Sequence, residues 1–159
     1  RSGRPLKYHG QTKSGSREGV GQLQYLDERG EFVVCSFVGG LPHGHGAAYF
    51  PNGDYFEGEF RQGQQWQGVL YLANNHKYEG PFDQGLYHGR GQLTFADGRK
   101  YVGEFSKGVR HGYGNYTWPN GSSYNGNWKE GKQHGKGVFT DEKGVVFDGE
   151  FFQGKKVLN

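Results

Sequence analysis

The sequence has few cysteines, no methionine and no long apolar segment, and each shortage excludes a class of protein. Cys35 is the single cysteine among 159 residues, so no disulfide can form within the chain. No segment approaches the run of about 18 apolar residues that a membrane-spanning helix needs. A reducing, cytoplasmic setting is therefore expected. Because the chain starts at Arg1 and contains no methionine, we also expect it to be a piece of a longer protein.

Aliphatic residues are scarce, whereas glycine and aromatic residues are abundant. Only 32% of the residues are apolar, but 31 residues are glycine and 16% are aromatic. Disordered segments are poor in rings, so the aromatic content argues against disorder. Together, glycine and rings predict a thin, β-rich structure in which rings pack against bare backbone. The formal charge of +3 is spread among interleaved acidic residues, which disfavours nucleic acid as a partner.

A period of 23 residues organises most of the chain. Segments starting at Tyr78, Tyr101 and Tyr124 each read aromatic-x-Gly-x-aromatic, followed by a glycine and by His-Gly-x-Gly. We expect a single array of about six and a half repeats. The repeats are assigned to residues 8–32, 33–55, 56–77, 78–100, 101–123 and 124–146, with a partial repeat at 147–159.

Each repeat predicts two strands. Aromatic residues and glycine alternate with polar residues, as in residues 101–105, and this period of two is typical of a β-strand. The alternation resumes after His-Gly-x-Gly, so each repeat predicts a β-hairpin. Pro81 falls inside a predicted strand, where it cannot donate a ladder hydrogen bond, and predicts a local irregularity.

Two kinds of turn are predicted around these strands. Asn-Gly and Asp-Gly pairs accept positive φ angles and predict the tight turns between repeats. These pairs are Asn52-Gly53, Asp97-Gly98 and Asn120-Gly121. The recurring histidines, such as His88, are interpreted as turn residues that hydrogen-bond to the backbone.

The motif Y-x-G-x-[WF]-x-x-G-x-x-H-G-x-G, repeated every 23 residues with a trailing Asn-Gly or Asp-Gly pair, resembles the MORN repeat (membrane occupation and recognition nexus). The resemblance covers nearly the whole chain. It is weakest in the first repeat, where Thr12 replaces the second aromatic residue and Glu18 the histidine. The strand pattern and the resemblance both predict an all-β protein. The expected architecture is an elongated, single-layer antiparallel sheet, or solenoid-like ribbon, of tandem β-hairpins.

Catalysis and cofactor binding are not expected. Residues 126–133 approach the phosphate-binding motif G-x-x-x-x-G-K-[ST] but lack its final hydroxyl residue, so no nucleotide or other cofactor is predicted. The histidines recur once per repeat rather than in close pairs, so no metal site is predicted. An alternative is a cluster of Cys35, His43 and His45, whose spacing could bring ligands together. No polar cluster breaks the period as an active site would.

The aromatic face predicts a binding surface. Glycines leave hollows in which neighbouring rings can lie flat, and the remaining ring area is expected to form a groove for a peptide or helix of a partner protein. The groove is assigned to Phe95, Tyr101, Phe105, Trp118, Tyr124 and Trp128.

The last predicted strand offers a second surface. Its backbone groups are unpaired unless something caps them, so two copies could pair along this edge as a homodimer. The edge is assigned to Phe147, Gly149, Phe151 and Gln153.

Three functions are compatible with these features. The favoured one is a rigid scaffold that binds partner proteins; the resemblance implies an association with cytoskeleton or membrane junctions. The second is binding to an anionic phospholipid surface such as a phosphoinositide membrane, by clustered basic residues. Those contacts would be Arg99, Lys100, Lys107, Arg110, Lys129, Lys132 and Lys136. The third, implied by the resemblance, is a targeting or regulatory arm of an enzyme whose catalytic domain lies outside this sequence.

Overall fold

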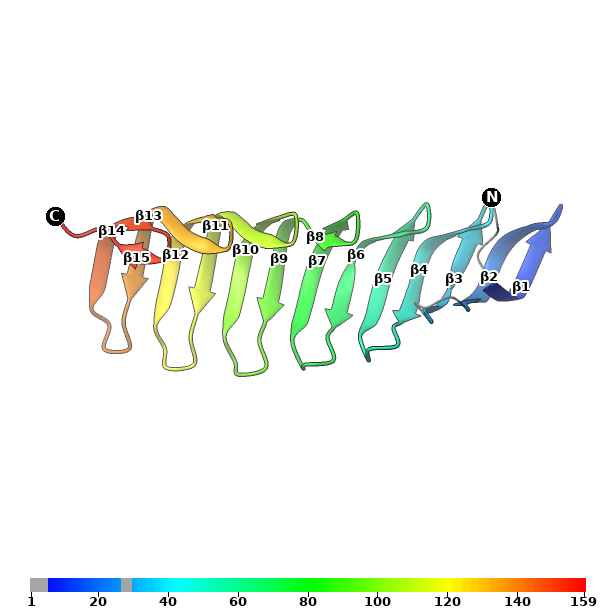
Figure 1. Ribbon diagram of the computed structural model, residues 1–159, viewed down its shortest axis with the longest axis horizontal. Coiled ribbons are helices and arrows are strands. Elements are labelled where there is room, and N and C mark those ends of the chain that lie inside the picture. Colours follow the sequence, from blue (N-terminus) through cyan, green and yellow to red (C-terminus); the bar gives the residue numbers. More distant parts are fainter. Residues whose placement is uncertain (1–5, 27–29) are drawn as a thin grey trace. The chain divides into compact units, whose positions relative to one another are not determined.

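The computed structural model describes residues 6–26 and 30–159 and places them in β-strands joined by turns (Figure 1). The chain divides into two compact units, Arg1–Asn75 and His76–Asn159. No helix long and apolar enough to cross a membrane is present among the described residues. The prediction of an all-β fold of tandem antiparallel hairpins is confirmed. The turn predicted at residues 26–30 contains residues 27–29, which lie outside the described residues.

The first unit is a sheet whose strands follow one another in sequence order, each antiparallel to its neighbours (Figure 1, blue to green). The strands are β1 (Leu6–Lys13), β2 (Ser16–Tyr25), β3 (Phe32–Val38), β4 (Leu41–Tyr49), β5 (Tyr55–Arg61) and β6 (Gln64–Tyr71).

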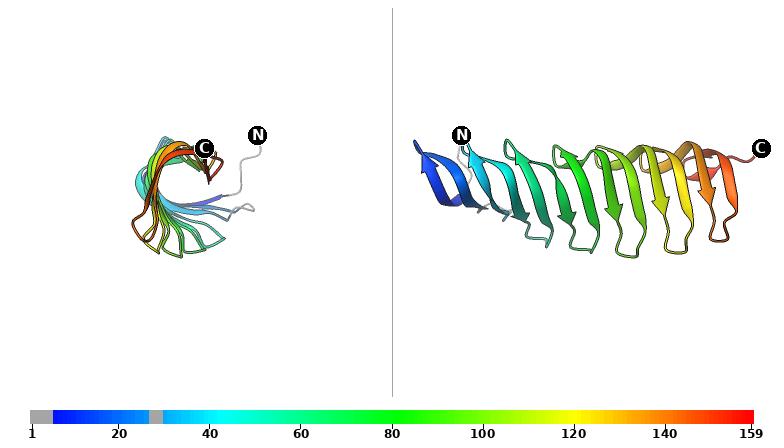
Figure 2. Two further views of the ribbon diagram at one scale, coloured as in Figure 1. Left: turned by 90° about the vertical axis from the view of Figure 1, so that its left-hand side faces the viewer. Right: turned by 180° about the vertical axis from the view of Figure 1, so that it is seen from behind.

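The second unit is built in the same way, and in both units the bent strands give a sheet that is curved when seen end on (Figure 2, left). Its strands are β7 (Lys77–Asp83), β8 (Leu86–Tyr87), β9 (Gly89–Thr94), β10 (Lys100–Ser106), β11 (Val109–Thr117), β12 (Ser123–Lys129), β13 (Lys132–Thr140), β14 (Val146–Phe152) and β15 (Lys155–Lys156).

The irregularity predicted at Pro81 is confirmed. The partner of β7 is split there into β8 and β9, whereas the matching strands β11 and β13 are continuous. Pro81 has no N–H to give to the ladder, and its carbonyl instead accepts a bond of 3.2 Å from the N–H of His88, at the break.

A row of glycines crosses each sheet at right angles to the strands. In the second unit, the residues paired from strand to strand along this row are Gly91, Gly103, Gly114, Gly126, Gly137 and Gly149. In the first unit the row is Gly10, Gly21, Gly46, Gly58 and Gly68, with Cys35 in place of a glycine between Gly21 and Gly46. Missing side chains along this line leave a furrow in the sheet surface.

Buried tyrosine rings fill the furrow. The ring of Tyr124 is fully buried, and a Cβ added to Gly137 would lie 2.5 Å from its Cε2 atom. The hydroxyl of Tyr124 donates to the carbonyl of Asn127 at 2.8 Å, so the polar tip is satisfied although the ring is buried. Residues Tyr8, Tyr78 and Tyr101 make the same bond three residues onward. The predicted glycine hollows are confirmed.

Edge-to-face ring contacts join successive repeats. Tyr101 contacts Phe105 of its own strand at 5.0 Å between ring centroids and Trp128 of the next repeat at 5.4 Å. Tyr124 contacts Phe151 of the following repeat at 4.9 Å. Such contacts are the preferred arrangement of aromatic pairs. The core of the second unit is therefore a continuous stack of rings on one face of the sheet, whereas the core of the first unit combines rings with Leu23, Val33 and Ala48.

The turns predicted at the Asn-Gly and Asp-Gly pairs are found between the repeats. Asn52-Gly53 lies in a five-residue connection, in which Gly53 has a φ of 94° and its N–H donates to the carbonyl of Phe50 at 3.0 Å. Each hairpin also has a two-residue turn that was not predicted, as at Lys107-Gly108, where both residues have positive φ angles of 50° and 84°. Consecutive positive φ angles match the right-handed twist of the paired strands.

The recurring histidines do not lie in turns: His88 lies between β8 and β9 and the others lie within strands, although the predicted backbone bond is found at His43, whose Nδ1 accepts from the N–H of Gln62 at 3.5 Å. His111 and His134 lie within β11 and β13, each directly before a glycine whose φ is positive: 65° at Gly112 and 76° at Gly135. At this point the pairing of β10 with β11 shifts, so the longer strand carries a bulge. The positive φ explains why glycine follows the histidine.

Within each unit, two-residue turns also bond to the preceding repeat. The N–H of Gly131 donates to the carbonyl of Arg110 at 3.0 Å, and Gly154 and Gly108 bond in the same way to the repeats before them. Ring stacking and these backbone bonds thus fix each hairpin on its predecessor.

We predict that Gly137→Ala destabilises the second unit by about 1–3 kcal/mol, because the added methyl group would overlap the Tyr124 ring. In a Tyr124→Leu background, the cost of Gly137→Ala should fall by at least about half, because the ring that it meets is gone. Urea unfolding of the unaltered chain, Gly137→Ala, Tyr124→Leu and the double variant measures the coupling free energy between the two positions.

Gly144→Ala is the matched control. Gly144 has open space around it and a φ of 82°, so alanine there is strained only by its backbone. Its cost should be the same with and without Tyr124. Equal costs of Gly137→Ala in the two backgrounds would show that the ring does not exclude a side chain from the row.

We also predict a loss of stability at high pH. Burial, and to a smaller extent the nearby Tyr113, raises the pKa of Tyr124 from 10.0 to about 12. This neutral hydroxyl therefore contributes stability fully below pH 10.0, and the contribution is lost as the pH rises through about 12. Tyr124→Phe should flatten the fall of the urea midpoint over this range. Identical pH profiles for the two proteins would contradict the assignment.

Candidate functional site

A groove of about 480 Å³ lies on the ring-bearing face of the second unit. Four basic side chains line it, and none of its lining residues, all within the fully described residues 76–159, is acidic. The basic residues are Arg99, Arg110, Lys132 and Lys156. The aromatic residues that line it are Tyr116, Trp118, Trp128, Phe139 and Phe151. We refer to this set as the cationic groove.

Arg110 is held rigidly at the floor of the cationic groove. Its Nη2 donates to the carbonyl of Gly131 at 2.8 Å. Its Cζ lies 4.7 Å from the ring centroid of Trp128 and 5.1 Å from that of Tyr116. A planar guanidinium stacks well on aromatic faces, so this positive charge is fixed in position before any ligand arrives.

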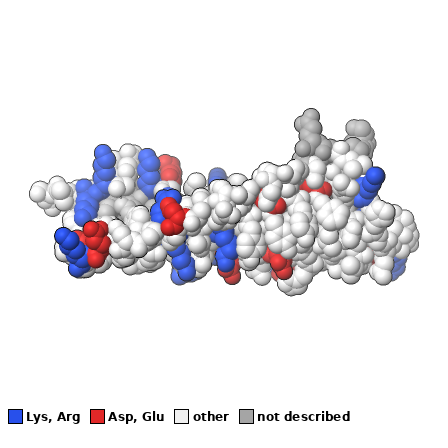
Figure 3. All heavy atoms as spheres, turned by 90° about the horizontal axis from the view of Figure 1, so that it is seen from below, with Lys and Arg blue, Asp and Glu red and all other residues white. Residues whose placement is uncertain are grey.

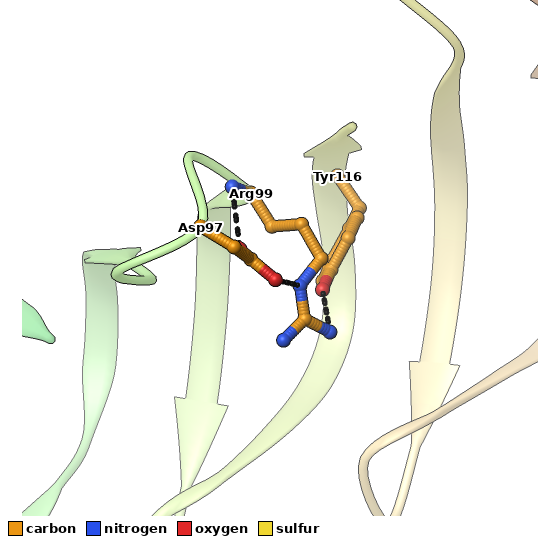
Figure 4. A network of polar contacts seen from close by, with 3 residues as sticks. All are labelled: Asp97, Arg99 and Tyr116. Atoms are coloured by element: carbon orange, nitrogen blue, oxygen red, sulfur yellow. Dashed lines mark hydrogen bonds and ion pairs between the residues drawn. The ribbon is translucent and has the colours of Figure 1, made fainter. Parts of the chain in front are cut away.

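Arg99 is positioned by a polar network with Asp97 and Tyr116 (Figure 4). Its Nε donates to Asp97 Oδ2 at 2.7 Å, and its Nη1 donates to the Tyr116 hydroxyl at 3.3 Å. The main-chain N–H of Arg99, and after it the guanidinium, lower the pKa of Asp97 below its ordinary value, against the effect of burial. Part of the charge of Arg99 is thus already compensated.

The other two cations are more open. Lys132 and Lys156 are both exposed, and the Nζ of Lys156 lies 4.8 Å from the ring centroid of Phe139. Phe139 and Trp118 are half-buried, with ring centroids 5.9 Å apart. The cationic groove therefore combines accessible ammonium groups with accessible ring area.

Most of the predicted groove residues are buried rather than accessible. Tyr101, Phe105, Tyr124 and Trp128 are at most 5% exposed, because they form the ring stack on the glycine row. They cannot act as exposed anchors. Phe95 and Trp118 are half-buried and keep accessible ring area, and Trp118 and Trp128 line the cationic groove.

Sequence reasoning missed Phe139 and Phe151 as groove residues and placed Arg110 and Lys132 in a membrane contact. Phe139 pairs across the strands with Tyr124, so the cross-strand register is what brings it to the ring face. Phe139 lies one repeat period after Tyr116, so this spacing in the sequence could have placed it on the same face.

The predicted dimer edge lies on β14. Phe151 is 4% exposed and packs on Tyr124, so its ring belongs to the core. The outer side of β14 is partly paired: Phe151 and Phe152 pair with β15, and the N–H of Val157 donates to the carbonyl of Glu150 at 2.8 Å. The unpaired stretch in the described structure is therefore the part of β14 near Phe147 and Gly149, while Gln153 lies in the turn before β15.

The seven predicted lipid contacts do not share one face. Arg99, Arg110 and Lys132 line the cationic groove, whereas Lys100 and Lys136 alternate with Tyr101 and Gly137 and so point to the opposite face. Lys107 and Lys129 lie at the hairpin turns. Basic side chains of the second unit are correspondingly dispersed among acidic ones (Figure 3).

The alternative metal cluster does not form. Cys35 belongs to the glycine row on the ring face, while His45 is paired with Glu59 and alternates with Gly46, so it points to the other face. No group of three His, Cys, Asp or Glu side chains that could hold a metal is found in the described residues. Burial raises the pKa of the Cys35 thiol to about 11, which disfavours the reactive thiolate.

Comparison with known proteins gives a repeat family. A model of the MORN repeat family matches five stretches of the chain, at residues 36–55, 56–77, 78–98, 101–123 and 124–146.

Curated relatives include Alsin from Rattus norvegicus, Mus musculus and Homo sapiens, each 44% identical to the chain over 92 residues. The aligned region is 54% of this chain but 6%, 6% and 5% of those proteins, so the chain spans about a twentieth of their length. Among solved structures, a mutant of the TCP10 domain of Danio rerio CPAP aligns with 83% of this chain and 72% of that chain. Its TM-score of 0.31 and identity of 14% are too low to carry an argument.

Proposed function

Because the chain belongs to the MORN repeat family, a family of non-catalytic repeat modules, we propose that it is an interaction module whose cationic groove holds a segment of a partner protein. One observation carries the proposal: the groove joins four basic side chains to half-buried rings and contains no acidic residue. Such a site offers both apolar area and directional charge, which together give affinity and register.

The partner segment best matched to this surface is acidic and carries apolar side chains. Carboxylates of the partner would meet Lys132 and Lys156, the two exposed ammonium groups. Apolar side chains would cover the accessible parts of Trp118 and Phe139. Arg110 needs no rearrangement to take part, because the carbonyl of Gly131 and the Trp128 ring already hold it.

A membrane surface is the alternative ligand of the same charge. A flat anionic surface attracts basic side chains in proportion to how many reach it together. In the second unit Lys100 and Lys136 point away from the face that carries Arg110 and Lys132, so a flat surface would reach only part of the set. A narrow segment inside the groove would contact Arg110 and Lys132, which lie on the same face. The protein ligand is therefore favoured over the membrane.

This function suits a scaffold that keeps partners at fixed positions beside the cytoskeleton or a membrane, and it suits equally the targeting arm of a larger enzyme. The ring stack and the backbone bonds between hairpins leave little freedom within a unit, so a bound segment would be held rigidly. No catalytic step is assigned to the described residues.

We predict that a twelve-residue peptide probe of alternating glutamate and leucine binds the full chain, and that a lysine–leucine probe of the same length does not. Lys132→Gln together with Lys156→Gln should weaken binding by about tenfold, and Trp118→Ala by a similar factor. Titration calorimetry at low and high salt measures the affinity, which should fall as salt screens the contacts.

Lys136→Gln is the charge-matched control, because Lys136 lies on the opposite face; Tyr113→Ala removes an exposed ring outside the groove. Both should bind as the unaltered chain does. Vesicles of phosphatidylcholine with and without a phosphoinositide test the alternative. Vesicle binding that Lys136→Gln and Lys132→Gln weaken equally, with no peptide binding, would replace the groove by a membrane contact.

Pairing of two copies along β14 is a second proposal. Val146 and Phe152 are 59% and 57% exposed at this strand, so the edge offers apolar area beside its unpaired backbone. Light scattering after size exclusion should give twice the chain mass, and Val146→Lys should give a single chain, because a charge on the edge opposes pairing. A single chain for both proteins at all concentrations would refute the pairing.

A further inference from the structure

The first unit carries an aromatic row that the second unit lacks. Four rings lie next to one another across strands β3 to β6: Phe32 pairs with Tyr49, Tyr49 with Tyr55, and Tyr55 with Tyr71. Adjacent ring centroids are 6.0, 4.9 and 5.9 Å apart in that order. We call these four residues the tyrosine row.

The tyrosine row lies on the face opposite the ring stack. Tyr55 alternates with Phe56 and Tyr49 with Ala48, both of which are fully buried in the core. Tyr49 and Tyr71 are 47% and 45% exposed. The fold therefore does not need these rings in its core, and burial does not explain their presence.

The repeat itself does not explain them either. At the same register in the second unit, none of the paired residues is aromatic. These residues are Lys77, Thr94, Lys100, Thr117, Ser123, Thr140 and Val146. Four aromatic residues in succession are thus specific to the first unit, and a departure confined to some repeats is how a binding site appears in a repeat protein.

A groove of about 690 Å³ runs beside the tyrosine row. Its floor includes Val34, Ala47 and Val69, and its ionisable lining residues besides the tyrosines are Glu57 and His45. Among the described residues, no lysine or arginine lines it. Its described lining thus differs from that of the cationic groove, since it holds the Glu57 carboxylate and no lysine or arginine.

Glu57 is held at the wall by one of its own rings. The hydroxyl of Tyr55 donates to Glu57 Oε2 at 3.1 Å. Burial first, and the bond to Glu57 second, raise the pKa of Tyr55 to about 12, so the hydroxyl remains a donor at neutral pH. Glu57 is exposed, and no lysine or arginine among the described residues pairs with it. Glu57 thus lines the groove with one carboxylate oxygen bonded to Tyr55 and no described lysine or arginine beside it.

We propose that the tyrosine row and Glu57 form a second binding site, which takes an arginine-containing segment of a partner protein. The site is independent of the cationic groove and differs from it in the sign of the charge that it selects. Guanidinium groups stack on the faces of tyrosine rings, and an arginine fork can also donate two bonds to one carboxylate. Rings spaced along four adjacent strands offer several such stacking positions in succession.

Other occupants fit less well. An apolar segment would bury the Glu57 carboxylate without a counter-charge, which costs free energy. An acidic segment would bring like charge to Glu57. A proline-rich segment could stack on the rings but would make no use of the carboxylate. The described lining has a carboxylate and no lysine or arginine, in a chain with a formal charge of +3, which favours a cationic ligand at this place.

The experiment uses the full chain and three labelled peptides of alternating glycine with arginine, citrulline or glutamate. Citrulline keeps the shape of arginine but carries no charge. Fluorescence anisotropy should show binding of the arginine peptide and at least about tenfold weaker binding of the other two. Glu57→Gln should weaken the arginine peptide by about threefold to tenfold.

Ring substitutions separate recognition from folding. Tyr49→Leu with Tyr71→Leu should weaken the arginine peptide by about tenfold, whereas Tyr49→Phe with Tyr71→Phe should stay within about threefold, because phenylalanine keeps the aromatic face. Tyr113→Leu, on an exposed tyrosine of the second unit, is the matched control and should bind unchanged. Unfolding midpoints of all variants check that the sheet is intact.

Three outcomes would overturn the proposal. These are equal binding of the arginine and citrulline peptides, equal losses from the leucine and phenylalanine pairs, and a loss from Lys132→Gln as large as that from Glu57→Gln. The last result would place the peptide in the other groove. Failure here leaves the binding of acidic peptides by the second unit untouched, because that test uses different residues and the opposite probe.

Discussion

The contact on which both units depend is an aromatic ring packed on paired glycines of neighbouring strands; the ring is tyrosine at most positions and Phe56 over Gly58 and Gly68. A sheet that stands alone has no second layer to cover its apolar residues, and this chain has too few aliphatic side chains to build one. Glycines aligned across the strands leave room for a ring such as that of Tyr124 to be buried against the backbone. The hydroxyl of Tyr124 donates to the carbonyl of the residue three positions later. Glycine and tyrosine thus replace the missing layer.

Cohesion uses one face of the sheet, so the other face is free to vary. On the ring face, Tyr101 and Phe105 serve the stack, and ligand contacts are confined to its margin around Trp118 and Phe139. On the opposite face, residues such as Tyr55 in the first unit and Lys100 in the second occupy the same register without touching the core. Two units of one design can therefore carry surfaces of opposite charge.

The sequence predicts the part of this structure that is periodic. Strand alternation, the glycine hollows and the interruption at Pro81 follow from residue types at fixed spacing, and all are found. The turns between repeats are found at the predicted Asn-Gly and Asp-Gly pairs, whereas the two-residue turns inside the hairpins were missed, because Lys107 and Glu130 adopt positive φ angles although they are ordinary polar residues. Exposure could not be read from the period, since Phe95 and Tyr101 differ only in what their neighbours cover. Tyr49 and Tyr71 become neighbours of Tyr55 through strand register, which spacing along the chain does not display.

The backbone bond from each hairpin turn to the hairpin before it gives the array a direction. The N–H of Gly131 donates to the carbonyl of Arg110, and the N–H of Gly154 donates to the carbonyl of Gln133; each acceptor lies in the preceding repeat. A hairpin added at the end of such an array can pair with the last strand. The N–H of its turn glycine can donate to a backbone carbonyl of the hairpin before it. Gene segments that encode one whole repeat can therefore be duplicated or lost as units, which lets evolution change the number of binding positions without redesigning the joint between them.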